Sequence, residues 1–162
     1  FPLFDHDNII YAIGGIATDI TERKLNEREI RLRADHIIDL FNNAPCAYHS
    51  VNNQGIITEI NDTELKWLGY TREEVINKMH ILQILADDGK KLFDYYFPKV
   101  KQGKIDTLTN VELKMKRKDG TLFLVESNIT MQFDEEGNFV STRSSFFDIS
   151  MRKHAESLIS QN

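Results

Sequence analysis

The residues that could bind a metal ion are few and far apart. Cys46 is the only cysteine, and no two of the five histidines have the His-x-x-x-His spacing that zinc sites use. We therefore expect no metal site, and the single cysteine, which can form no disulfide within the chain, fits a reducing compartment. The histidines are His6, His36, His49, His80 and His154.

A second group of residues could line a small-molecule cavity. His80 lies in the helical segment MHILQIL, where it could contact a ligand or pack as an ordinary core or surface histidine. Arg143 lies in the middle of a strand; facing inward it would need an anion or a carboxylate partner, and facing outward it would form a surface ion pair. The aromatic residues could surround a cavity or fill a solid core. The candidate pocket residues are Tyr48, Trp67, His80, Phe93, Phe97, Phe123 and Arg143.

No catalytic motif accompanies these residues. Gly14 and Gly15 lack the lysine of a phosphate-binding loop, and the sequence contains no G-x-S-x-G segment. His154 is not followed by the residues that follow a phosphate-accepting histidine in kinases. We therefore predict that the chain is not itself an enzyme.

Charge and hydropathy argue against two classes of partner. The net charge is −5 and the basic residues form no stripe, so we expect no nucleic-acid partner. No segment approaches the run of about 20 apolar residues that a membrane-spanning helix needs, so we expect no membrane contact. A hydrophobic fraction of 41% is enough for a packed core. The sequence thus predicts a soluble, cytoplasmic chain.

The two ends of the chain carry nearly the same sequence. DITERK begins at Asp19 and DISMRK begins at Asp148, and the similarity extends back without a gap to Phe4 and Phe133. A long fixed period indicates tandem modules. We predict four parts: residues 1–20 are the C-terminal strands of a preceding module, 21–43 a linker helix, 44–150 a complete module and 151–162 the start of a C-terminal helix.

The elements that must position these residues follow from local patterns. The segment 21–43 contains no glycine or proline, and Thr21 can cap it as a helix. Its apolar stripe has helical spacing and could pack on its own domain or against the same helix of a second copy. Both readings stay open. The stripe, which is the candidate dimer helix face, consists of Ile30, Ala34, Ile37 and Phe41.

The remaining segments predict a mixed α+β fold. Two strands, CAYHSV and IITEIN, are joined by a turn in which Gly55 supplies a positive φ. The segment VELKMK alternates with period two, and RKDG and DEEGN are turns between three strands of an antiparallel meander. Between the two groups of strands, composition and glycine breaks predict short helices at about 62–68, 72–77, 80–86 and 87–101.

In this order, the segments NNQGIITEIND, WLGYTREEVINK, RKDG, DEEGNFV and DISMRK resemble a PAS domain over about residues 36–153. The resemblance implies a five-stranded antiparallel sheet with short helices on one face, here preceded by a long N-terminal helix, and a small-molecule pocket in many members. PAS domains stand in tandem ahead of histidine kinases or cyclic-nucleotide enzymes and often dimerise. The resemblance therefore implies a homodimer, neighbouring PAS and output domains as partners, and a sensor histidine kinase of a two-component system as the parent protein.

The resemblance also bears on cofactors. Flavin-binding photosensory PAS domains carry NCRFLQ with a reactive cysteine, whereas this chain has MHILQIL. Haem-binding members use a histidine on the long helix, and the segment KKLFDYYFPKVKQG contains none. We predict neither flavin nor haem, which leaves a small molecule of unknown identity as the candidate ligand.

In the family, the DIT triplet ends the last strand and begins the helix that leads to the next module. Ile149 would stay in the core while Ser150 caps the departing helix. A ligand that shifts the sheet would thereby move this helix, which makes the chain a regulatory sensor module. The alternative is a ligand-free spacer that dimerises and relays strain between modules. The expected signal-relay residues are Asp19, Thr21, Asp148, Ile149, Ser150 and Arg152.

Overall fold

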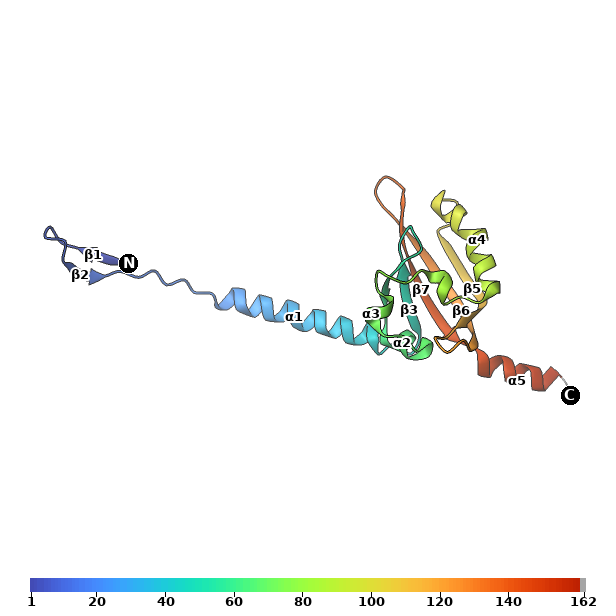
Figure 1. Cartoon of the computed structure of the whole chain (residues 1–162). Helices are drawn as coiled ribbons and strands as arrows, with labels where there is room; N and C mark the ends of the chain where they lie inside the picture. Colours follow the sequence, from blue (N-terminus) through green and yellow to red (C-terminus); the bar gives the residue numbers. More distant parts are fainter. Residues whose placement is uncertain (161–162) are drawn as a thin grey trace. The chain divides into compact units, whose positions relative to one another are not determined.

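The computed structural model describes residues 1–160, which form two compact units, one ending at Asp39 and one starting at Leu40 (Figure 1). The first unit opens with an antiparallel hairpin of β1 (Pro2–Phe4) and β2 (Ile10–Ile13). Asp5 closes its turn, because its Oδ1 accepts the N–H of Ile9 at 2.9 Å. Asn8 takes the left-handed conformation there, with φ of 62°.

Helix α1 (Thr21–Asn42) follows the hairpin and crosses the boundary between the units. Asp19 Oδ1 accepts the N–H of Thr21 at 2.9 Å, which fixes the start of the helix. None of the residues of α1 is buried, and Ile30 and Ile37 in the predicted stripe are 68% and 65% exposed. The stripe is therefore an apolar surface of the helix.

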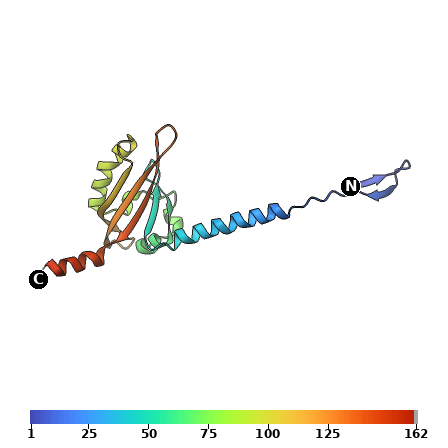
Figure 2. The same cartoon turned by 180° about the vertical axis from the view of Figure 1, so that it is seen from behind.

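The second unit is built on a five-stranded antiparallel sheet with the strand order β4-β3-β7-β6-β5 (Figures 1 and 2). The first and last parts of the unit thus meet in the middle of the sheet, where β3 pairs with β7. The strands are β3 (Ala47–Val51), β4 (Ile57–Ile60), β5 (Thr107–Lys116), β6 (Leu122–Phe133) and β7 (Phe139–Asp148).

The turn between β6 and β7 has the same hydrogen bonds as the N-terminal hairpin. Asp134 Oδ1 accepts the N–H of Glu136 at 3.0 Å and of Asn138 at 2.8 Å, and Gly137 has φ of 83°. The matching stretches of sequence thus adopt matching turns.

Four helical segments lie between β4 and β5, and a fifth follows the sheet. They are α2 (Asp62–Leu68), α3 (Arg72–Val75), the 3-10 turn η1 (Ile81–Gln83), α4 (Asp87–Lys101) and α5 (Ser150–Ser160). The predicted helices over 62–68 and 87–101 are confirmed. The predicted boundary of α3 is wrong, because Ile76 is extended and Asn77 has φ of 57°.

The predicted helix over 80–86 is also wrong, since only the single turn η1 forms there. The backbone on either side of this turn forms β-bridges with other segments instead. His80 forms a bridge with Ile56, and Leu85 forms one with Met115. These extended residues cannot also take helical dihedrals, so the segment runs alongside the sheet as an irregular connection.

The core lies between the sheet and the helices of the second unit. Alternation along the strands places Met115, Val125 and Phe146 in this core, each at most 2% exposed. The residues that alternate with them point outward, and Lys114 and Arg143 are exposed. The sheet thus presents its apolar face to the helices.

Candidate functional site

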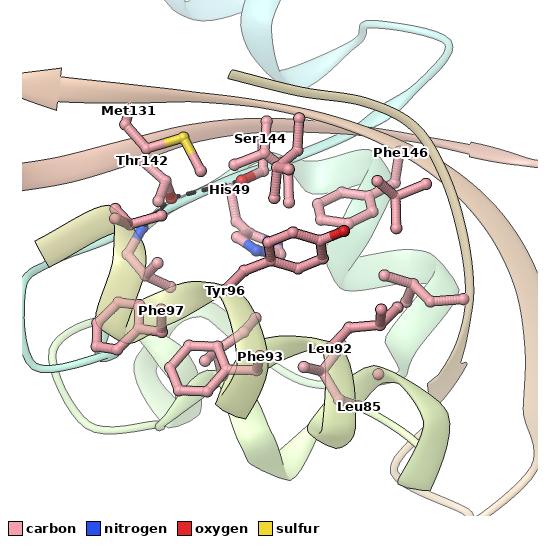
Figure 3. A pocket seen from close by; sticks show the side chains of 18 residues that line it. His49, Leu85, Leu92, Phe93, Tyr96, Phe97, Met131, Thr142, Ser144 and Phe146 are labelled. Atoms are coloured by element: carbon pink, nitrogen blue, oxygen red, sulfur yellow. Dashed lines mark hydrogen bonds between the residues drawn. The ribbon is translucent and has the colours of Figure 1, made fainter. Parts of the chain in front are cut away.

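A cavity of about 100 Å³ lies between α4 and the sheet (Figure 3). Apolar side chains of α4, among them Leu92, Phe93 and Phe97, form one wall, and residues of β3, β5, β6 and β7 form the other. An engineered apolar cavity of about 150 Å³ is enough to hold benzene. This cavity, which is smaller, therefore has room for a compact molecule smaller than benzene.

Few polar groups face the cavity, and they come mostly from the two central strands. Thr142 and Ser144 of β7 line it beside His49 of β3, and Tyr96 contributes a hydroxyl from α4. Ser144 Oγ donates to Thr142 Oγ1 at 3.4 Å, and that oxygen also accepts the N–H of Val51 at 3.1 Å. The cavity surface is thus almost wholly apolar, with a few buried polar side chains among the residues that line it.

His49 belongs to a buried acid–base pair. Its Nδ1 lies 2.7 Å from Glu64 Oε1, and the two side chains are only 2% and 1% exposed. Phe146 stacks on the imidazole with ring centroids 4.6 Å apart, which fixes the orientation of the ring. Glu64 Oε2 is buried without a hydrogen-bond partner among the described residues. The carboxyl group is therefore held through one oxygen, by the histidine alone.

Local structure explains how two residues so far apart in sequence meet. Asn61 caps α2, accepting the N–H of Glu64 through Oδ1 at 3.0 Å, and this places Glu64 in the first turn of the helix. The same oxygen accepts the N–H of Tyr48 on β3 at 3.0 Å. The cap thereby ties the start of α2 to β3 and brings Glu64 next to His49.

Two of the predicted pocket residues line the cavity. Phe93 and Phe97 lie on successive turns of α4 and stack with ring centroids 4.4 Å apart. His80 contacts Phe93 edge to face, with centroids 5.8 Å apart, but it is not among the lining residues. Its Nδ1 accepts the N–H of Leu82 at 3.2 Å, so it caps η1.

The other predicted pocket residues lie outside the cavity. Tyr48 packs edge to face on Phe41 at the end of α1, and Trp67 packs in the same way on Phe123. Arg143 is exposed, as expected for its outward-facing alternative. These aromatic residues therefore contribute to packing around the core.

The sequence reasoning missed His49, Glu64, Thr142 and Ser144. Period-two alternation was the available indication, because Thr142 and Ser144 share the face of β7 that carries the buried Phe146. The contact between His49 and Glu64 had no sequence pattern to reveal it.

The strand-to-helix joint at the C-terminal end of the sheet is well defined. Asp148 Oδ1 accepts the N–H of Ser150 at 2.9 Å, the same bond at the same length as that between Asp19 and Thr21. Ile149 is 4% exposed, and its N–H donates to Leu124 O at 3.1 Å. Hydrogen bonds from Thr21 hold the pKa of Asp19 below its usual range.

Two ion pairs fix the first turn of α5 to the sheet. Arg152 Nη2 lies 2.9 Å from Glu126 Oε2 on β6, and Lys153 Nζ lies 2.8 Å from Glu112 Oε1 on β5. The hydrogen bonds to these carboxylates raise the pKa of Arg152 and of Lys153 above their usual values. The helix is thus attached to two strands by charge as well as by the covalent chain.

Residues 1–160 contain no cluster of three or more histidine, cysteine, aspartate or glutamate side chains that could hold a metal ion. None of the helices within these residues is long and apolar enough to span a membrane.

The family model and the similar solved structures point to the same family. The PAS domain model matches residues 45–151. A comparison with curated protein sequences gave no match. Among solved structures, the PAS domain of an HTR-like protein from Haloarcula marismortui is similar, with a TM-score of 0.61 and 22% identity, covering 78% of this chain and all, 100%, of that one.

Two further structures show the same fold. A PAS domain from Colwellia psychrerythraea has a TM-score of 0.61 and 22% identity, covering 76% of this chain and 98% of that one. A PAS domain from a two-component sensor histidine kinase has a TM-score of 0.59 and 22% identity, covering 74% and 98%. The sheet order, the helices on one face and the family match over residues 45–151 agree, and the chain belongs to the PAS domain family.

Proposed function

We propose that this chain is the small-molecule-sensing module of a larger signalling protein, with the cavity beneath α4 as its ligand site. The observation that supports this most directly is the cavity itself, of about 100 Å³, with an almost wholly apolar lining. A solid spacer would gain stability from filling such a space, because a cavity forfeits packing contacts on all its walls. One similar PAS structure, from Burkholderia thailandensis, is a complex with ethanol.

A route from the cavity to the end of the domain supports a role in relay. Thr142, Ser144 and Phe146 of β7 line the cavity, and the same strand ends at the joint that starts α5. A ligand changes the position of α5 to the extent that it binds two arrangements of β7 with different affinity. The proposed output is therefore a movement of α5.

The parent protein that we propose is a cytoplasmic sensor histidine kinase of a two-component system, with this chain as a non-catalytic part. The repeated joint and the repeated turn support the inference that residues 1–20 end a preceding PAS domain. The kinase context is suggested by the similar PAS domain of a two-component sensor histidine kinase. The proposed partners are the neighbouring PAS and output domains.

We also propose that the chain forms a homodimer through α1. Ile30, Ala34, Ile37 and Phe41 are spaced by four, three and four residues, which is the spacing of a two-stranded coiled coil. Ile30 and Ile37 are exposed. The exposed apolar part of this stripe would be covered by the same stripe of a second copy.

The ligand can be tested by denaturing the purified chain and analysing the released compounds by mass spectrometry, with an absorption spectrum to detect flavin or haem. We expect a colourless protein that releases a compact organic molecule, or that binds one when screened. The variant Ser144→Leu fills the part of the cavity beside Thr142 and should no longer bind this molecule. Ser145→Leu, on the neighbouring half-buried position of β7, is the matched control.

The alternative function is a ligand-free spacer that dimerises and relays strain. The observation that favours it is the similarity of the two joints, at Asp19 and at Asp148, which would let movement pass through the module unchanged. If the chain is a spacer, Ser144→Leu should leave the output of the parent protein unchanged. The denatured chain should then release no compound. That pair of results would contradict the sensor proposal.

A further inference from the structure

The acid–base pair behind the cavity wall determines what kind of ligand the cavity can accept. His49 lines the cavity, and its Nδ1 is engaged with Glu64 at 2.7 Å. Among the described residues no partner takes up the second ring nitrogen, Nε2, which leaves it available to a cavity ligand. Whether Nε2 donates or accepts a hydrogen bond depends on how the pair shares its protons.

Two arrangements of the pair carry no net charge, and they have the same consequence. In one, an imidazolium donates from Nδ1 to the Glu64 carboxylate, so Nε2 also carries a hydrogen. In the other, a protonated Glu64 donates to Nδ1 of a neutral imidazole, whose hydrogen is then on Nε2. Either way, Nε2 is a donor.

The arrangement in which Nε2 accepts a hydrogen bond is disfavoured by burial. It combines a neutral imidazole, protonated at Nδ1, with an ionised Glu64, and so leaves a net negative charge. The side chains are 2% and 1% exposed, and Glu64 Oε2 is buried without a partner among the described residues. A buried carboxylate with one oxygen unsatisfied and no cation beside it is strongly penalised.

We infer that the ligand of this cavity is a compact, uncharged, largely apolar molecule with one hydrogen-bond acceptor, such as a ketone, and that His49 Nε2–H donates to that acceptor. The inference rests on the proposed function, that the cavity is a small-molecule site. A neutral pair offers no net charge to an anion, and the apolar wall excludes a cation. Thr142 and Ser144 are bonded to each other and flank the same end of the cavity.

The test uses two probes of equal shape on the 162-residue chain. Cyclobutanone and methylenecyclobutane each have about five heavy atoms, fewer than benzene as the smaller cavity requires, and differ only in C=O against C=CH₂. Their dissociation constants are measured by NMR titration. We expect the ketone to bind about tenfold more tightly, because the alkene leaves the Nε2–H donor unpaired.

A double variant isolates the donor from the fold. Replacing His49 alone would strand a buried carboxyl group, so His49→Phe is combined with Glu64→Met, since apolar replacement of a whole buried pair is often well tolerated. The double variant should lose the tenfold preference for the ketone, so that its dissociation constants for the two probes become about equal. A preference that survives in this variant would overturn the assignment to His49.

A third measurement needs no substitution. Ring ¹⁵N NMR of His49 should show a protonated Nε2 in both the empty and the ketone-loaded chain. An unprotonated Nε2, or equal affinity of the parent chain for both probes, overturns the inference and leaves the small-molecule site intact. If neither probe binds and Ser144→Leu also changes nothing, it is the proposed ligand site itself that fails, and the inference with it.

Discussion

At the scale of single residues, His49 and Glu64 form the least expected contact in the chain. Both lie in the core, where His49 Nδ1 and Glu64 Oε1 lie 2.7 Å apart. Such pairs contribute little net stability compared with apolar residues of similar volume, because both groups lose their hydration. Their presence in a cavity wall is consistent with the proposed role in binding a ligand.

Breaking this pair should destabilise the domain strongly. We expect His49→Phe alone to lower the free energy of unfolding by about 3–5 kcal/mol, because Glu64 is left buried without a partner. The double variant His49→Phe/Glu64→Met should recover most of that loss. Urea unfolding followed by circular dichroism measures both. Equal stability of the single and double variants would show that the two side chains are not coupled.

Gly55 is a second residue whose surroundings constrain it, because both its backbone conformation and the nearby His80 favour glycine. Its φ is 79°, and an added Cβ would lie 2.5 Å from His80 Nε2, whereas Gly103 has φ of 68° and open space around it. We expect Gly55→Ala to cost more stability than Gly103→Ala. The second change adds only the strain of a left-handed alanine, about 1–2 kcal/mol. Urea unfolding of the two variants provides the comparison, and equal losses would rule out the clash with His80.

At the scale of elements, the turns and the joint are held by carboxylates. Hydrogen bonds from Asn138, the larger from its backbone N–H and the smaller from its side chain, hold the pKa of Asp134 below its ordinary value of 3.8. A lowered pKa in the folded state means that the ionised Asp134 contributes stability above its unfolded pKa and loses it as the pH falls through the folded pKa. The β6–β7 turn should therefore loosen only in acid.

We expect the Asp134 carboxyl group to titrate below pH 3.8. Over the same pH range, the backbone amide of Asn138 should lose its protection from exchange with solvent. NMR of the side-chain carboxyl carbons and of the backbone amides follows both. In Asp134→Asn the pH dependence of the Asn138 amide should disappear. A titration of Asp134 at or above its ordinary value would contradict the hydrogen bonding described for this turn.

The ion pairs of α5 lead to a prediction about local opening. Glu112→Gln with Glu126→Gln removes both carboxylates that bind Lys153 and Arg152. The amides of α5 should then exchange with solvent faster, while those of β6 and β7 stay protected, because the helix has no buried residue of its own. Hydrogen-exchange mass spectrometry detects this. Glu136→Gln, in the β6–β7 turn, serves as the control, and unchanged exchange in α5 would show that charge does not hold the helix.

Much of the sheet was predictable from the sequence, because strands and turns depend on neighbouring residues. Alternation in VELKMK and the Asp119-Gly120 turn are local, and the five-stranded sheet followed from them and from the family resemblance. The helix over 80–86 was mispredicted because β-bridges to Ile56 and Met115 hold its ends extended despite its helical composition. Of the cavity, the sequence predicted the aromatic wall of Phe93 and Phe97. It did not predict the pair of His49 and Glu64, because they meet through the Asn61 cap, which composition does not indicate.

At the scale of the whole molecule, α1 is the element with most to gain from a second copy. We expect the chain to be dimeric by light scattering, and Ile37→Glu to shift it toward monomer by placing a charge in the apolar stripe. His36→Glu introduces the same side chain away from the stripe and should remain dimeric. A parent chain that is monomeric at high concentration would exclude pairing through α1.

The side-chain amide of Asn61 connects the end of α1 to the start of α2. Besides capping α2, its Nδ2 donates to Phe41 O at the end of α1 and to Cys46 O, both at 3.0 Å. A single side chain thus joins the incoming helix to the turn that carries Glu64. If a bound molecule alters the preferred pose of the incoming helix, thermodynamic reciprocity requires that helix to alter the molecule's affinity by the same factor. In the proposed parent protein, a module that precedes α1 would then set the ligand concentration at which this domain responds.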